Sequence, residues 1–248
     1  DARSFFDKHV YLGVNSDNVW TLASSLGNEI VYIGKIDSLV SLLETDISDA
    51  ILTNSRASCT YYADKYFSAV RDSKRGILYS GSLDISIDGS ECVFTTNSIP
   101  NHNFNDSTAS FATNVSVVPA EFRTAIAGVF ADFNTPLTLS YDNAVMLNGV
   151  KIDLLAAGCF GVGNGNIGCN DINQPWRYDP MSPLARFGTD IHNAHTQPDG
   201  TYHYHGNPQA LFDQSVTVAS PVIGFAADGF PIFGRYVDDP NMISRLLY

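Results

Sequence analysis

The chain has 248 residues and a formal net charge of −12, because Asp and Glu outnumber Lys and Arg by 26 to 14. This balance argues against binding to nucleic acid or to an anionic membrane surface, since both need clustered Lys and Arg. No apolar run reaches the roughly 18 residues of a membrane-spanning helix, so no span is predicted. A hydrophobic content of 44%, with 12% aromatic residues, is typical of a globular protein rich in residues that favour β-sheets.

Three segments have the spacing of a helix. Apolar residues fall at positions 36, 39, 40 and 43, and again at 62, 66, 67 and 70, which predicts helices at Ile36–Leu43 and Tyr61–Val70. Pro119–Phe130 is predicted as a third helix, because proline suits the first turn and its apolar residues share one face. We therefore expect residues 1–76 to form a helical or mixed N-terminal region that packs on the main domain.

From residue 77 onward the patterns are mostly those of β-strands. Leu83–Ile87 alternates apolar and polar residues and runs into an Asp88-Gly89 turn. Asn148-Gly149 and Asp228-Gly229 predict two further hairpins. The expected fold class is α+β, predominantly antiparallel β and sandwich-like, with a small helical N-terminal region before a β-rich domain at 77–248.

The four cysteines favour an oxidising compartment. Cys159 and Cys169 bracket a short glycine-rich loop, which a disulfide would stabilise by about 2–3 kcal/mol, and this leaves Cys59 and Cys92 as a second pair. Four free thiols or cysteine metal ligands are the alternatives, but no Cys-x-x-Cys spacing occurs. The sequence therefore predicts an extracellular or periplasmic protein.

Four of the six histidines lie within residues 189–205: His192, His195, His203 and His205. His203 and His205 are two apart and project from one face of a strand, whereas a spacing of three suits a helical turn or a tight loop. Between the pairs, Gln197–Gly200 is a turn sequence that can fold them back towards each other. Because neutral imidazole is the commonest metal-binding side chain, we predict a copper or zinc site.

Other residues are candidates for the same site. His102 follows a strand-like segment and lies in a Pro/Asn loop, which makes it the candidate distant ligand. His192 is the weaker ligand of its pair, and Asp190 stands two residues before it as an acceptor that can orient a ligating imidazole. Asp228 is a candidate catalytic residue, with an ordinary turn former as the alternative.

Several motifs together resemble the YHYH protein family, which is named for a Tyr-His-Tyr-His tetrapeptide, here Tyr202–His205. The resemblance covers roughly residues 80–236. The motifs that carry it are Asn97–His102, Leu147–Val150, Ala157–Gly163, Trp176–Pro180, His192–His205 and Ser220–Gly234.

The resemblance implies a secreted, periplasmic or lipid-anchored protein, and some family members occur in proposed copper or other metal contexts. The residues at the family's motif positions are His102, His195, His203, His205 and Asp228. Family members usually continue beyond the last motif with an acidic and aromatic segment, whereas this chain ends at Tyr248. If that segment supplies ligands, the site here is incomplete or borrows from a neighbour.

Three functions follow as alternatives. The first is a secreted protein that binds copper or zinc. The second is a metal-dependent enzyme, either a hydrolase or a copper oxidoreductase, in which Asp228 or a tyrosine assists. The third is a structural or interaction protein in which the histidines form a polar network. Calcium is a further candidate ion, because Asn164 and Asp171 offer oxygen ligands.

Overall fold

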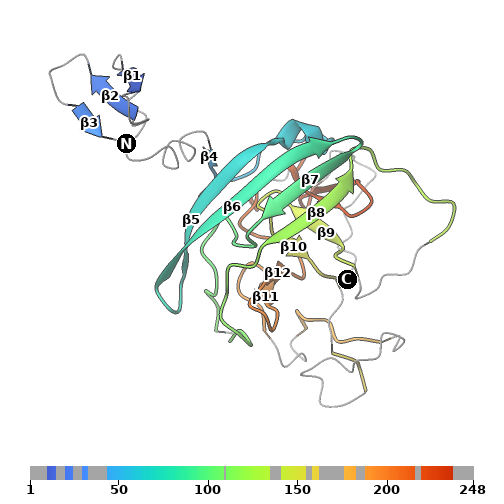
Figure 1. The fold of residues 1–248 in the computed structure, drawn as a ribbon. Helices are drawn as coiled ribbons and strands as arrows, with labels where there is room; N and C mark the ends of the chain where they lie inside the picture. Colours follow the sequence, from blue (N-terminus) through green and yellow to red (C-terminus); the bar gives the residue numbers. More distant parts are fainter. Residues whose placement is uncertain are drawn as a thin grey trace. The chain divides into compact units, whose positions relative to one another are not determined.

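The computed structural model of the protein describes residues 10–14, 20–24, 30–32, 44–108, 110–134, 141–154, 158–161, 176–182, 188–215 and 219–236. The chain divides into two compact units, Asp1–Thr45 and Asp46–Tyr248. The first unit contains an antiparallel three-stranded sheet (Figure 1). Its strands are β1 (Val10–Val14), β2 (Trp20–Ser24) and β3 (Ile30–Tyr32).

A five-stranded sheet has the strand order β4-β5-β6-β7-β8. Its strands are β4 (Thr45–Asp46), β5 (Asp64–Asp72), β6 (Ile77–Asp88), β7 (Glu91–Thr96) and β8 (Ala120–Ala125). From β5 to β8 each strand pairs antiparallel with the next, and Figure 1 shows these long strands side by side.

A six-stranded sheet has the order β11-β12-β10-β9-β13-β14. Its strands are β9 (Ala144–Met146), β10 (Lys151–Ile152), β11 (Ala194–Thr196), β12 (Tyr202–Tyr204), β13 (Val222–Ala226) and β14 (Pro231–Phe233). The β10–β12 pair is parallel and the other pairs are antiparallel. The parallel pair brings the Asn148-Gly149 hairpin beside the strand that carries His203.

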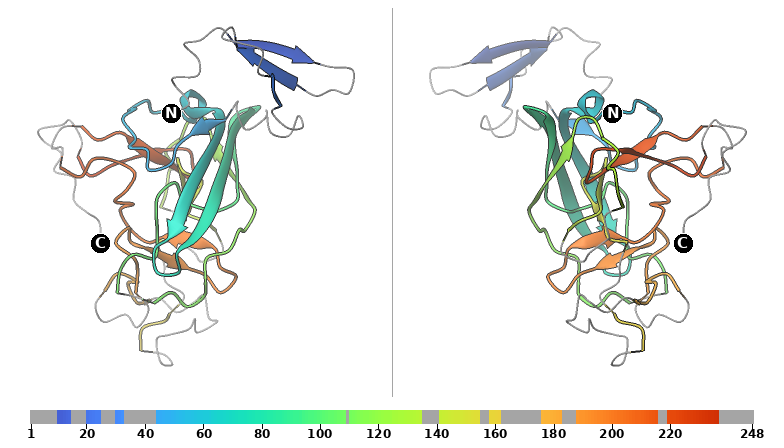
Figure 2. Two further views of the ribbon diagram at one scale, coloured as in Figure 1. Left: turned by 90° about the vertical axis from the view of Figure 1, so that its left-hand side faces the viewer. Right: turned by 90° about the vertical axis from the view of Figure 1, so that its right-hand side faces the viewer.

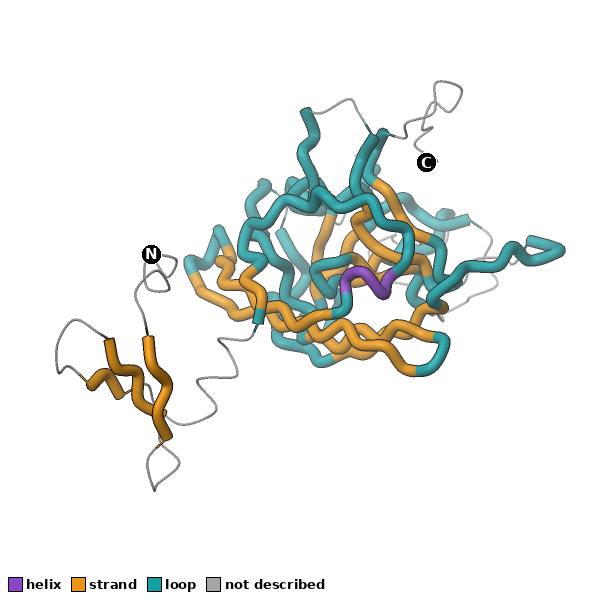
Figure 3. Tube along the Cα trace, turned by 90° about the horizontal axis from the view of Figure 1, so that it is seen from above, coloured by secondary structure: helices purple, strands orange, loops and turns teal. Residues whose placement is uncertain are grey.

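Apolar side chains of these two sheets form a shared core. Leu83 of β6 and Phe94 of β7 cluster with Val145 of β9 and Phe225 of β13. The long strands form one layer and the shorter strands a second layer (Figures 2 and 3). The layers approach closely at Gly149, where a Cβ atom would lie 2.5 Å from the Thr96 hydroxyl oxygen.

The prediction of an α+β fold with a helical N-terminal region is wrong, because the described residues contain β-sheets and no α-helix. The predicted helix at Tyr61–Val70 is a short 3-10 turn, η2 (Cys59–Tyr62), followed by β5. Pro119–Phe130 contains β8. A spacing of four residues fits a strand as well as a helix, and pairing with β6 and β7 selects the strand. Ile36–Leu43 lies outside the described residues.

The predicted hairpin turns are confirmed. Asp88-Gly89 joins β6 to β7, Asn148-Gly149 joins β9 to β10, and Asp228-Gly229 joins β13 to β14. The three glycines have φ angles of +61°, +79° and +87°, which residues other than glycine adopt only with steric strain. Among the described residues, no helix is long and apolar enough to span a membrane.

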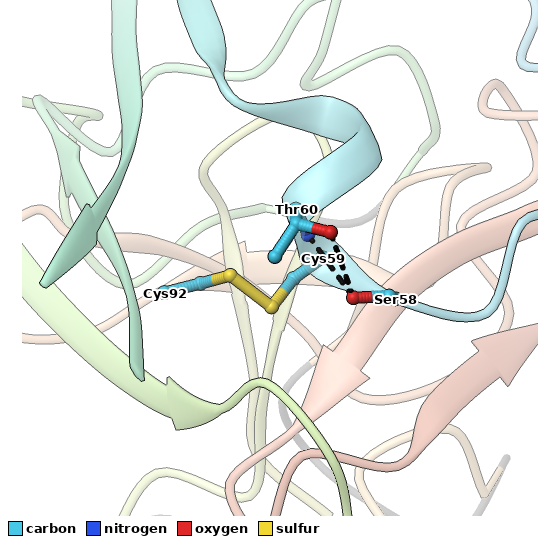
Figure 4. The surroundings of a disulfide bond; sticks show 4 residues. All are labelled: Ser58, Cys59, Thr60 and Cys92. Carbon is cyan, nitrogen blue, oxygen red and sulfur yellow. Dashed lines mark hydrogen bonds between the residues drawn. A yellow bond between two sulfur atoms is a disulfide. The ribbon is translucent and has the colours of Figure 1, made fainter. Parts of the chain in front are cut away.

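The predicted disulfide between Cys59 and Cys92 is confirmed. It ties η2 to β7, and both cysteines are fully buried. Figure 4 shows the bond beside the turn, where the Ser58 hydroxyl accepts a hydrogen bond from the backbone N–H of Thr60. Cys159 is also disulfide-bonded, and Cys169 lies outside the described residues.

Removal of the Cys59–Cys92 bond should destabilise the fold, because the bond closes a loop between residues 33 apart in sequence. The C59A/C92A variant should lose about 3–4 kcal/mol of unfolding free energy, through the greater entropy of its unfolded chain. Urea denaturation of both proteins measures the loss. An unchanged free energy of unfolding would show that the bond does not constrain the unfolded chain.

Candidate metal centre

The β11–β12 hairpin brings three histidines together. Its turn runs through Gln197–Gly200, as predicted: Gly200 has φ +91°, and its N–H donates to the Gln197 carbonyl over 2.9 Å. The Asp199 carboxylate accepts from the Thr201 N–H, and this bond lowers the pKa of Asp199. The register that follows places His195 directly opposite His203.

Alternation along β12 separates its tyrosines from its histidines. Tyr202 and Tyr204 are fully buried in the core of the six-stranded sheet, as the sequence predicted. His203 and His205 project from the other face, and at 3% and 8% exposure they are also buried. The imidazoles therefore stand in a protected site instead of facing solvent.

The three imidazoles converge through their Nε2 atoms. His205 Nε2 lies 2.9 Å from His203 Nε2 and 3.0 Å from His195 Nε2. One ligand atom from each residue falls within 4.8 Å of the others, and this is the one such group of three metal-ligating side chains among the described residues. We call these three residues the histidine triad.

Backbone carbonyls fix the hydrogen positions of two triad rings. His195 Nδ1 donates to the Gly188 carbonyl over 3.1 Å, and His203 Nδ1 donates to the Thr201 carbonyl over 3.2 Å. A carbonyl can only accept, so in the neutral rings both Nε2 atoms carry a lone pair. His205 Nε2 can supply at most one hydrogen for two short contacts. A cation at the common point satisfies all three nitrogens.

Burial keeps the three imidazoles of the triad neutral. Burial, followed by the charge of His195, lowers the pKa of His205 to about 3. The Asp153 backbone opposes this shift, although His205 Nδ1 makes no hydrogen bond within the described residues. Burial also lowers the pKa of His195 and, with the other two rings, that of His203. All three rings are therefore neutral near pH 7, as metal ligation requires.

The structure places His102 apart from the triad, on the face that carries the tyrosines. Its Nδ1 donates to the Asn103 carbonyl over 2.7 Å, and its Nε2 accepts from the Tyr204 hydroxyl over 2.6 Å. Tyr204 OH also accepts from Asn148 Nδ2. The Nε2 atom of His102 thus holds β12 and its Nδ1 atom is bonded within its own loop, so neither is available as a ligand.

His192 also lies outside the triad. Its ring is centred 4.0 Å from the His102 ring, and its Nε2 lies 3.1 Å from a carboxylate oxygen of Asp106. Asp190 does not orient that ring. Its carboxylate instead accepts from the backbone N–H groups of His192 and Ala194.

Asp190 anchors the loop that leads into β11. Besides those two bonds, its carboxylate accepts from the Asn105 N–H and, over 2.8 Å, from the Tyr202 hydroxyl. Burial raises the pKa of Asp190, and these donors oppose the rise. The loop includes Gly188, whose carbonyl holds the His195 ring. Asp190 therefore supports the triad from the opposite face of the sheet.

Three polar residues beside the triad, Lys151, Asp153 and Gln197, were not predicted from the sequence as part of the site. Ile152 pairs with Tyr204 in the parallel register, so Lys151 and Asp153 lie on the histidine face. One Asp153 carboxylate oxygen receives Gln197 Nε2 at 3.0 Å and Lys151 Nζ at 3.1 Å. Burial raises the pKa of Asp153, against the effect of Lys151. The only sequence signal for Lys151 and Asp153 is the alternation of side chains after the Asn148-Gly149 turn.

Asp228 is exposed in the turn between β13 and β14. No contact among the described residues joins it to the triad. The predicted calcium ligands Asn164 and Asp171 lie outside the described residues.

Acid should destabilise the metal-free protein. Burial, followed by the charge of His192, lowers the pKa of His102 from 6.5 to about 3. Between pH 6.5 and pH 3, His102 therefore binds a proton in the unfolded chain but not in the folded chain. The free energy of unfolding is unaffected by His102 above pH 6.5 and falls as the pH is lowered from 6.5 towards 3. Urea denaturation of both proteins, with chelator present, gives the unfolding free energy at each pH between 6 and 4. Plotted against pH, this free energy should fall less steeply for H102Q than for wild type, by up to about 1.4 kcal/mol per pH unit. Equal slopes would show that His102 titrates normally.

Neutralising Asp190 should cost more than removing one of its donors. D190N turns one acceptor atom into a donor that faces other donors, which predicts a loss of about 2–4 kcal/mol of unfolding free energy. Y202F removes a single hydroxyl and should cost about 1–2 kcal/mol. Urea denaturation of both variants makes the comparison. A smaller loss for D190N than for Y202F would contradict the role of Asp190 as the anchor.

The family model described as YHYH protein matches residues 121–245. The match contains the histidine triad and does not reach His102. No curated protein and no solved structure matches the chain. Because the family model covers half of the chain, the protein belongs to the YHYH protein family.

Proposed function

We propose that this protein binds a divalent transition-metal ion through the Nε2 atoms of His195, His203 and His205. The observation that carries the proposal is their convergence at 2.9 and 3.0 Å while backbone carbonyls fix the Nδ1 hydrogens of two rings. One hydrogen on His205 Nε2 can serve only one of these two contacts, and the lone pairs of the other contact repel each other unless a cation lies between them. Nitrogen donors without sulfur suit copper and zinc.

The same contacts weigh against a purely structural histidine network. Such a network needs a donor for every acceptor, whereas the triad has one free hydrogen for its contacts at most. Among the described residues, His205 Nδ1 is buried without a hydrogen-bond partner, which a structural network would leave as a cost. Metal ligation through Nε2 places a hydrogen on Nδ1, beside the Asp153 backbone.

An extracellular or periplasmic location accompanies the proposal. The Cys59–Cys92 disulfide supports it, because such bonds persist in oxidising compartments.

A metal-dependent enzyme is the second candidate. The observation that favours it is the Lys151–Asp153 pair on the histidine face, with its nitrogen-to-oxygen distance of 3.1 Å. When bound, a metal ion would supply Lewis acidity there. Asp142 and Asp153 together hold the Lys151 ammonium, with their carboxylate oxygens 2.6 Å and 3.1 Å from Nζ. Asp228 takes no part in this candidate, because it lies exposed in a distant hairpin turn of the sheet.

The H203A/H205A variant should lose metal binding and keep its fold. Wild-type protein should retain roughly one ion per chain after dialysis, and the variant less than a tenth of that. With the ion at about 100 times its Kd, the unfolding free energy of wild type should rise by about 2.7 kcal/mol and that of the variant should not change. Elemental analysis and urea denaturation measure the two quantities.

The matched control is H192Q, which removes an imidazole outside the triad. It should retain metal as wild type does. Unchanged metal content in H203A/H205A, or equal losses in both variants, would refute the triad as the site.

A further inference from the structure

The spacing of the triad carries information about coordination geometry. Imidazole nitrogens bind zinc or copper at about 2.0–2.1 Å. Two nitrogens that lie 2.9 or 3.0 Å apart, as His205 Nε2 does from its two neighbours, then subtend an angle of about 90° at the ion. A tetrahedral angle would need a separation of about 3.3–3.4 Å at the same bond length.

The orientations of the rings agree with this geometry. The ring centroids of the triad are separated by 4.7, 4.7 and 4.8 Å, and the ring planes cross at 75°, 80° and 67°. The three imidazoles therefore surround one axis at nearly equal spacing. The two short contacts of His205 Nε2 then set two angles near 90° at the ion, as in octahedral or square-pyramidal coordination.

The fold resists widening of the triad. His203 lies on β12 and His205 directly follows it, and the two tyrosines of β12 are fully buried and bonded to Asp190 and His102. On β11, pairing with β12 and the Gly188 carbonyl hold His195. A tetrahedral ion would have to push these anchored rings apart by about 0.3–0.5 Å, against close-packed surroundings.

We propose that the histidine triad coordinates its ion at right angles and therefore selects Cu(II) over tetrahedral Zn(II). This inference rests on the proposed function, since it concerns the ion held by the same three nitrogens. Tetragonal geometry with nitrogen donors is typical of Cu(II), whereas zinc in protein sites is almost always tetrahedral. The triad contains no thiolate or thioether, the ligands that favour Cu(I).

Affinity for copper alone does not test the geometry, because Cu(II) binds most nitrogen sites more tightly than Zn(II). Ni(II) against Zn(II) is the informative pair, since Ni(II) tolerates right angles and disfavours a tetrahedron. The experiment titrates metal-free full-length protein with Ni(II), Zn(II) and Co(II). We expect Ni(II) to bind at least as tightly as Zn(II), and Co(II) to give the weak visible absorption of five- or six-coordinate ions.

Intense tetrahedral Co(II) absorption, with Zn(II) binding tenfold or more tightly than Ni(II), would overturn the inference and leave the proposed function standing. Binding of none of these ions would instead refute the proposed function. Y202F, which frees β12 from Asp190, should shift the preference towards Zn(II) relative to wild type. H192Q should leave the Ni(II)-to-Zn(II) ratio unchanged, and a shift in this control equal to that in Y202F would contradict the rigidity argument.

Discussion

The strict alternation of side chains along β12 is the constraint on which the candidate site depends. It sends Tyr202 and Tyr204 into the core, and His203 and His205 to the opposite face. A buried tyrosine hydroxyl needs a partner, and these two find Asp190 and His102. The strand cannot slip by one residue without moving the histidines into the apolar core that the tyrosines occupy, so the core fixes the position of the site.

Two backbone carbonyl groups near the β11–β12 hairpin orient the imidazole rings. By accepting from Nδ1, the Gly188 and Thr201 carbonyls direct the lone pairs of His195 and His203 to one point. A metal site needs such supporting contacts as much as its ligands, because they set ring orientation and basicity. The triad is preorganised, so an ion bound there would lose little affinity to rearrangement.

Local patterns predicted the hairpins and all three histidines of the triad. Asn148-Gly149 and Asp228-Gly229 require positive φ angles, which few residues other than glycine supply. The spacing of Tyr62, Tyr66 and Val70 fits both a helix and a strand, and only pairing with β6 decides between them. Sequence could not place His102, because a loop residue can reach either face of a sheet. Lys151 and Asp153 reach the site through a parallel pair between segments distant in sequence.

Anomalous diffraction tests the central claim most directly. The claim is that three Nε2 atoms share one cation. A crystal of the copper-loaded protein, measured on both sides of the copper absorption edge, should show a single strong anomalous peak about 2 Å from the Nε2 atoms of His195, His203 and His205. A fully loaded crystal with its peak elsewhere, or with no peak among these rings, would contradict the account.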